Sequence, residues 1–233
     1  NADPSGRRVK GMINNCAGGV TPWGTWLTCE ENINFYFDGN DAVMRSPDAK
    51  ALARYGFGKP WNPWARVDPR FDMAHEPNEP NRFGWVVEID PFDPASMPKK
   101  RTAMGRFKHE GAGNIVNMDG RFVVYQGDDE RFDYVYRFVT DGRVDPKDRA
   151  ANRDLLDSGS LSVARFDADG TGKWLPLTQG QSGLVGASGF ADQGDVVIHA
   201  RLAADILGAT RMDRPEDIEV DPITNRVFVL LTN

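Results

Sequence analysis

The sequence predicts an all-β fold of short strands joined by tight turns, arranged as a sandwich, a barrel or a propeller. Two observations carry this prediction. Glycine and proline supply 24 and 15 of the 233 residues, about 17% of the chain against an average of roughly 12%. In addition, turn-forming segments at 118–120, 167–170 and 221–225 each lie between two apolar segments, which is typical of hairpins.

The first half of the chain predicts strands on either side of a long insertion. Threonine and aromatic enrichment predicts a strand over 22–28, and an apolar segment predicts another over 83–89. Residues 38–82 are rich in Pro, Gly, Asp and Asn, which indicates an irregular insertion with a short helix near 48–54. Residues 99–107 are expected to form a strand pair or a loop.

The second half predicts three hairpins, one further strand and one helix. The hairpins pair 113–117 with 121–126, 160–168 with 172–177, and 217–220 with 226–231. Residues 133–139 alternate as a strand does, and 145–156 have a weak helical pattern. Apolar residues over 193–208 recur at helical spacing, and Gly208 stands where a helix would stop.

Charge and hydropathy narrow the classes of partner. The chain has 28 basic and 34 acidic residues, a net charge of −6, which argues against a general nucleic-acid or anionic-membrane surface because both need a basic field. No apolar run approaches the ~20 residues of a membrane span. We therefore expect no nucleic-acid partner and no membrane insertion. We also expect a monomer.

Three segments share one plan, and this repetition favours a propeller over the other all-β folds. Segments 14–31, 109–130 and 214–233 each open with a polar loop, continue into an apolar strand, and turn into a second strand that ends in carboxylates or an amide. Their loops carry Cys16, Glu110 and Glu216. Equivalent loops of successive propeller blades meet at one end of a central channel, which would bring these three residues together.

Converging acids of this kind predict a metal site. Neighbouring carboxylates coexist only when they are protonated, solvated or neutralised by cations. Carboxylate oxygens suit Ca²⁺, and a thiolate beside them suits a softer or redox-active ion such as iron. A set of solvated loop acids is the alternative interpretation at this point.

The same three segments resemble the PhoX-type alkaline phosphatases. The matching segments are 14–32 (NNCAGGVTPWGTWLTCEEN), 106–111 (RFKHEG) and 214–219 (RPEDIE). The resemblance implies a six-bladed β-propeller with irregular insertions and one or two short helices. It also implies a cluster of two ferric and three calcium ions, hydrolysis of phosphate monoesters, and a periplasmic or extracellular location after twin-arginine export.

The resemblance also implies roles for individual residues. It places the iron-binding cysteine on Cys16, two metal-binding glutamates on Glu110 and Glu216, and the active-site arginine on Arg214, which would also bind substrate. Strand-end placement adds calcium-side ligands at Glu30, Glu31 and Asp128. His109 is a candidate partner of the ligands or a contact to substrate.

The expected chemistry follows from charge. Cations on the phosphate oxygens cancel the repulsion of an attacking anion, and an oxo or hydroxo group between the metals would attack phosphorus. Arg214 suits a two-pronged contact with phosphate oxygens. The alternatives are a calcium-dependent lactonase or esterase and a non-catalytic, metal-stabilised binding propeller. A Cys16–Cys29 disulfide is also open, and it would keep Cys16 from iron.

The length of the chain bears on its organisation. Family members run to several hundred residues. We therefore expect residues 1–233 to form a single domain that is part of a larger propeller, with the N-terminal export region and the C-terminal blades absent from this sequence, so that the segment taken alone would be inactive.

Overall fold

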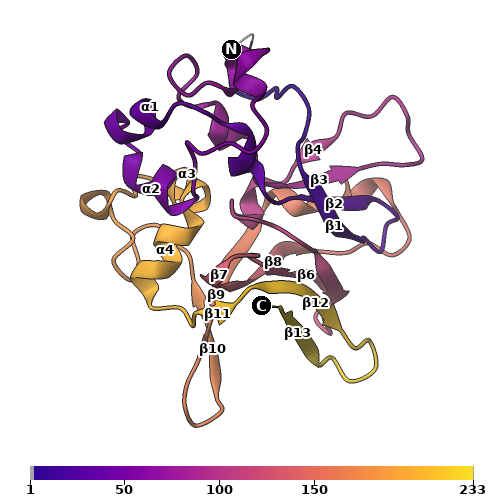
Figure 1. The fold of residues 1–233 in the computed structure, drawn as a ribbon. Helices are drawn as coiled ribbons and strands as arrows, with labels where there is room; N and C mark the ends of the chain where they lie inside the picture. The colour runs from indigo at the N-terminus through magenta and orange to yellow at the C-terminus, as the bar shows by residue number, and fades with distance from the viewer. Residues whose placement is uncertain (1–2, 233) are drawn as a thin grey trace.

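Four separate antiparallel sheets form the β part of the molecule in the computed structural model, which describes residues 3–232 (Figure 1). The first sheet has the order β1 (Asn15–Val20), β2 (Trp26–Glu30), β3 (Val86–Ile89), β4 (Lys99–Lys100). The second has the order β10 (Gly172–Pro176), β9 (Gly159–Phe166), β8 (Val135–Arg143), β6 (Arg121–Gly127), β5 (Gly113–Val116). The two smaller sheets are β7 (Arg131–Asp133) with β11 (Met212–Asp213), and β12 (Pro215–Val220) with β13 (Val227–Leu231).

The prediction of a six-bladed β-propeller is wrong for this chain. Over residues 3–232 the sheets contain four, five, two and two strands, and they do not close into a ring. Helices and short 3₁₀ turns fill much of the chain between them, so the fold is mixed rather than all-β. The hairpin patterns are local, and they do not determine how separate sheets are placed around one another.

The three predicted hairpins are confirmed, as β5–β6, β9–β10 and β12–β13. The turn of the first illustrates the cause. Asn117 donates its N–H to the carbonyl of Arg121 at 2.8 Å, and Gly120 takes a left-handed conformation with φ 84°. Glycine adopts this conformation without steric cost, which is why Asp-Gly marks such turns.

The helices lie toward one side of the molecule in Figure 1. They are α1 (Asn40–Arg45), α2 (Ala49–Arg54), α3 (Gln193–Ile198) and α4 (Ala200–Leu207). The single helix expected over 193–208 is two helices separated at His199, and Gly208 ends the second in a left-handed conformation as predicted. α2 matches the helix expected near 48–54, whereas α1 was not predicted. Residues 145–156 form only 3₁₀ turns.

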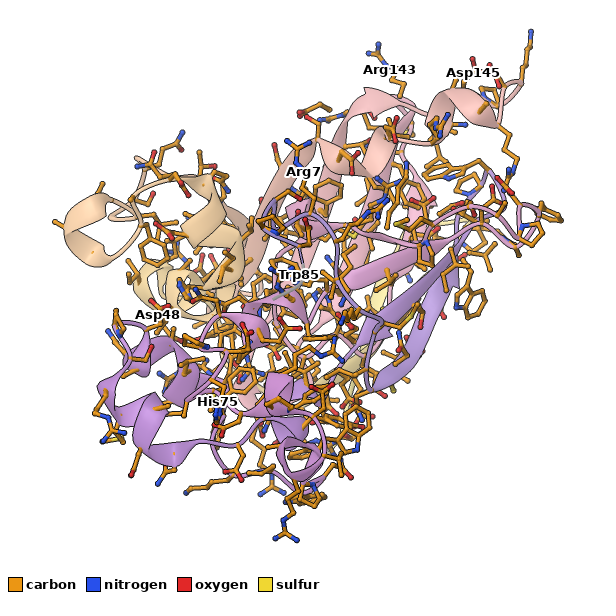
Figure 2. The ribbon with its side chains drawn as sticks, turned by 90° about the horizontal axis from the view of Figure 1, so that it is seen from above. Arg7, Asp48, His75, Trp85, Arg143 and Asp145 are labelled. Atoms are coloured by element: carbon orange, nitrogen blue, oxygen red, sulfur yellow. The ribbon has the colours of Figure 1, made fainter. Side chains whose placement is uncertain are left out.

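Two main hydrophobic clusters divide the molecule. The larger packs the first and second sheets against α3 and α4, with Phe122, Phe138 and Ala200 fully buried. The smaller fills the insertion, where Phe37 packs against Phe71 and Phe83. Figure 2 shows Asp48 and His75 in this helical region, Arg143 and Asp145 at the opposite end, and Trp85 between them. The segment predicted to be an irregular insertion therefore has its own core.

The helices in the described part of the chain are short. Over residues 3–232, none is long and apolar enough to cross a membrane.

The hairpin β12–β13 and the two large sheets contact one another through β1, β5 and β12. β5 contacts both β1 and β12. The approach is close at glycines: a Cβ added to Gly113 would lie 1.8 Å from the carbonyl oxygen of Ile218, and one added to Gly19 would lie 2.3 Å from that of Ala112. The glycines thus let the three units approach at the level of their backbones.

Candidate metal and phosphate site

The three repeated segments, 14–31, 109–130 and 214–232, form three structural units. Each unit begins with a β-bulge, in which the first side of the antiparallel pair has one residue more than the side that it faces. Two residues of β1 face one of β2, two of β12 face one of β13, and residues 110–112 face residues 126–127 in the second unit. The flanking pairs are Asn15–Glu30 with Gly18–Thr28, His109–Asp128 with Gly113–Tyr125, and Pro215–Leu231 with Ile218–Val229. Cys16, Glu110 and Glu216 each follow the first paired residue. Such bulges redirect a side chain away from the regular pleat. Cys16 and Glu216 therefore lie on strands, and only Glu110 lies in a loop.

A backbone hydrogen bond recurs at the same place in each unit. Its donors are the amides of Glu31, Asp129 and Thr232, and its acceptors are the carbonyls of Asn14, Lys108 and Arg214, at 3.0, 3.0 and 3.2 Å. The repeated plan seen in the sequence is therefore a repeated backbone geometry. Within it, Glu31 and Asp129 occupy equivalent positions in the first two units.

The equivalent positions converge on one acidic cluster. Carboxylate oxygens of Glu31, Glu110 and Asp129 all lie within 4.8 Å of one another. Glu31 and Asp129 are buried, and Glu110 is half-buried. The thiol of Cys16 adjoins Glu31 and Glu110, and Glu216 adds a further carboxylate beside Glu110. Four of the predicted site residues thus come together: Cys16, Glu31, Glu110 and Glu216.

The cluster resists ionisation. Burial, together with Asp129 and Glu110, raises the pKa of Glu31 to about 8. Burial, together with Asp129 and Glu216, raises the pKa of Glu110 to about 7. Partial burial and the two glutamates raise the pKa of the Cys16 thiol to about 11. Without a cation, several of these groups must hold protons near neutral pH.

Arg214 supplies the positive charge beside the cluster. Its Nε and Nη2 donate to the two carboxylate oxygens of Asp129, each at 2.9 Å, and its Nη2 lies 2.7 Å from Glu216. The side chain is 36% exposed, so it reaches the acids while remaining open to solvent. Its backbone has φ 51°, an uncommon value for a residue with a long side chain. Asn14, at the equivalent position of the first unit, has the same φ.

The structure does not bring Glu30 into the cluster. Its carboxylate is fully buried and accepts hydrogen bonds from Lys100 at 2.8 and 2.9 Å and from the amides of Ile13, Gly84 and Trp85. The predicted role of Glu30 as a calcium ligand stays a prediction, and its oxygens are already engaged.

Asp128 is engaged in the same way. Its carboxylate is fully buried, accepts from Nε of Arg201 at 2.8 Å and from Nη2 of the same side chain, and accepts the amide of Lys108 at 3.2 Å. Burial raises the pKa of Asp128 to about 6, although Arg201 opposes the shift. Its predicted ligand role likewise stays a prediction.

His109 lies in the hydrophobic interior. Its ring contacts that of Phe107 at a tilt of 31°, with centroids 3.7 Å apart, and its Nε2 lies 2.9 Å from the carbonyl oxygen of Gly105. Burial lowers the pKa of His109 to about 3, so the imidazole is neutral. The two cysteines are both free, with Cys16 exposed and Cys29 buried, so the alternative of a disulfide between them is not formed.

Asp129 is the cluster residue that the sequence interpretation missed. The pair Glu30-Glu31 and the pair Asp128-Asp129 end equivalent strands. The predicted calcium ligands include both glutamates but only the first aspartate, Asp128. Alignment of the two pairs would have selected Asp129 as the counterpart of Glu31, because successive side chains at a strand end point in opposite directions.

Comparisons with known proteins identify the family of this chain. A family model described as alkaline phosphatase PhoX matches residues 1–233. This chain belongs to the PhoX family. A solved structure, Pseudomonas fluorescens PhoX in complex with vanadate, a transition state analogue, is 54% identical, with a TM-score of 0.92. Among curated proteins, no significant match was found.

The chain spans less than half of that PhoX structure. The similarity covers 97% of this chain and 40% of the solved chain. The three sequence segments that indicated the family therefore lie in a region of high overall similarity.

Proposed function

We propose that this chain supplies part of the centre of a metal-dependent phosphomonoester hydrolase. The observation that carries the proposal is the convergence of Glu31 of the first unit with Glu110 and Asp129 of the second, beside Arg214. A phosphate monoester needs both features, namely cations for its charge and a rigid donor for its oxygens. The vanadate complex of the similar PhoX protein supports this reading.

The residues fit a metal cluster. Burial and the neighbouring acids raise the pKa values of Glu31 and Glu110, and bound cations would offset that penalty. Their oxygens suit Ca²⁺, and the thiol of Cys16 suits iron. We infer that Cys16, Glu31, Glu110, Asp129 and Glu216 hold metal, with two ferric and three calcium ions as the proposed content. The position of Cys16 in the cluster favours this over a calcium-only lactonase.

Arg214 is the residue that we assign to substrate. Asp129 and Glu216 fix its guanidinium at the edge of the cluster, while the side chain keeps solvent access. The guanidinium's Nη1, which takes no part in these contacts, can donate to phosphate oxygens and orient phosphorus for attack. Bound cations would neutralise the phosphate and stabilise charge on the leaving oxygen. We further propose an exported protein that acts on soluble phosphate monoesters.

Hydrolysis of p-nitrophenyl phosphate tests the proposal. The natural protein that carries this chain should hydrolyse it, lose activity on chelation, and recover when calcium and iron are restored. Glu110→Gln should abolish activity and metal retention. Glu219→Gln is the matched control, because Glu219 is an exposed acid on β12. Absence of activity from the metal-loaded protein would contradict the proposal.

A further inference from the structure

Two buried ion pairs involve the sequence neighbours of two residues of the acidic cluster. Glu30 pairs with Lys100, and Asp128 pairs with Arg201. The two carboxylates are fully buried and occupy equivalent positions, since Glu30 faces Asn15 and Asp128 faces His109 across their strands. In the third unit this position holds Leu231, which faces Pro215. The pairs are therefore specific to the two units that contribute Glu31 and Asp129.

Each buried carboxylate joins two segments of its own unit. One segment precedes Cys16 or Glu110, and the other is the strand end that carries Glu31 or Asp129. Glu30 precedes Glu31 and accepts the amide of Ile13, three residues before Cys16, at 3.0 Å. In addition it accepts the amides of Gly84 and Trp85 at 3.0 and 3.2 Å, which anchors it to the segment that enters β3. Trp85 lies near the centre of the view in Figure 2.

Asp128 makes the corresponding connection in the second unit. It precedes Asp129 and accepts the amide of Lys108, two residues before Glu110, at 3.2 Å. The carbonyl of Lys108 in turn accepts the amide of Asp129 at 3.0 Å. Arg201 is 1% exposed and reaches Asp128 from α4, so a helix far along the chain holds this junction.

We propose that Lys100 and Arg201 are positioning residues that act through Glu30 and Asp128 to set the spacing of the metal-binding side chains. This inference rests on the proposed metal site and replaces the ligand roles predicted for Glu30 and Asp128. A lysine or arginine cannot ligate a cation, so any effect of these two residues on metal binding must pass through the carboxylates. Loss of groups that hold ligands in place typically weakens metal binding 10–100-fold.

Metal affinity of the natural protein measures this role directly. Lys100→Met should weaken calcium binding, measured by chelator competition, by about tenfold or more. Lys99→Met is the matched control, because Lys99 is the adjacent residue of β4 and pairs with the exposed Asp154. It should leave the affinity within twofold of wild type. Lys100→Arg keeps the cation and should restore most of the affinity.

Thermal unfolding separates positioning from a general effect on stability. If Lys100 only stabilised the fold, Lys100→Met would lower Tm equally with and without calcium. If Lys100 positions the metal-binding side chains, the substitution should also reduce the rise in Tm that calcium produces. Arg201→Lys retains the buried charge. If Lys100→Met does not fold, the calcium affinity of Arg201→Lys tests the inference instead. We expect Arg201→Lys to weaken calcium binding several-fold, through the loss of the forked contact.

The outcomes are distinguishable. Wild-type calcium affinity in folded Lys100→Met, or in Arg201→Lys, would overturn the inference while leaving the metal site intact. Failure of the wild-type protein to retain calcium would overturn the proposed function, and this inference with it.

Discussion

Glu31 holds a proton more tightly in the folded chain than in the unfolded one, and this has a consequence for stability. Its pKa rises from 4.5 to about 8 on folding, chiefly through burial and then through the neighbouring acids. Between these values the folded state binds more protons than the unfolded state, so the free energy of unfolding falls as pH rises. The metal-free protein should therefore have a lower Tm at pH 9 than at pH 6.

Calcium should reverse that trend, because it takes the place of the proton. The measurement is Tm against pH for wild type and Glu31→Gln, with chelator and with calcium. The substitution removes the titrating group, so its chelated Tm should decline less between pH 6 and pH 9. Equal declines in the two chelated proteins would contradict the role of Glu31.

Arg214 carries a second prediction at the scale of a residue. Arg214→Lys keeps the charge but loses the fork that contacts Asp129 through two nitrogens. A charge-assisted hydrogen bond contributes about 1.5–3 kcal/mol, so kcat/KM for p-nitrophenyl phosphate should fall roughly 10–100-fold. Arg226→Lys, at an exposed position before β13, is the control and should have wild-type kinetics. Unchanged kcat/KM in Arg214→Lys would refute the assignment.

At the scale of the element, the contact between β5 and β12 depends on Gly113. A Cβ there would lie 1.8 Å from the backbone oxygen of Ile218, and a backbone atom cannot move aside as a flexible side chain can. Gly113→Ala should lower the free energy of unfolding by about 1–3 kcal/mol and displace Glu110 relative to Glu216.

Chemical denaturation and metal affinity together check this change. Gly186→Ala is the matched control, since an added Cβ there meets nothing within 4 Å. A loss of stability in Gly113→Ala with unaltered metal affinity would show that the spacing of the two strands does not govern the site.

The elements also show where the sequence suffices. Turn chemistry and alternation predicted β5–β6, β9–β10 and β12–β13, because these signals act within a few residues. The insertion was harder, since α1 and α2 have six residues each and are stabilised by tertiary packing around Phe37.

The candidate site likewise has a part that local sequence patterns predict and a part that depends on tertiary contacts. Motif spacing identified Cys16, Glu110 and Glu216. The different roles of Glu30 and Glu31 depend on which of two adjacent side chains meets Lys100, and Lys100 lies 70 residues away in the chain. The sequence around Glu30 does not contain that information.

At the scale of the whole molecule, Arg54 joins the helical region to the sheets. It extends from α2 and contacts Asp133 through both terminal nitrogens, and its Nε lies 3.0 Å from Asp205 of α4. Asp133 is 1% exposed. Arg54→Met would remove a principal partner of this buried acid and should destabilise the protein by about 3–5 kcal/mol.

Denaturant unfolding measures that loss. Arg45→Met is the control, because Arg45 is exposed on α1 and the substitution should change the free energy of unfolding by less than about 0.5 kcal/mol. Similar values for the two variants would show that Arg54 does not join the two regions.

The arrangement of the sheets was the largest error of prediction, and its cause also lies at this scale. Local patterns gave the strands, but the numbers of strands per sheet and the helical segments between them depend on contacts such as those of Arg54 and Arg201.

The left-handed backbone of Arg214 has a practical consequence for engineering. An L-residue at φ 51° costs about 1 kcal/mol relative to glycine, and asparagine tolerates it better than arginine, as at Asn14. That strain is smaller than the about 1.5–3 kcal/mol contributed by each hydrogen bond from Arg214 to Asp129, so the ion pair keeps the arginine in this conformation. Directed evolution of this protein should therefore vary positions 214 and 129 together, because asparagine or glycine at 214 alone relieves the strain but removes two hydrogen bonds from the buried Asp129.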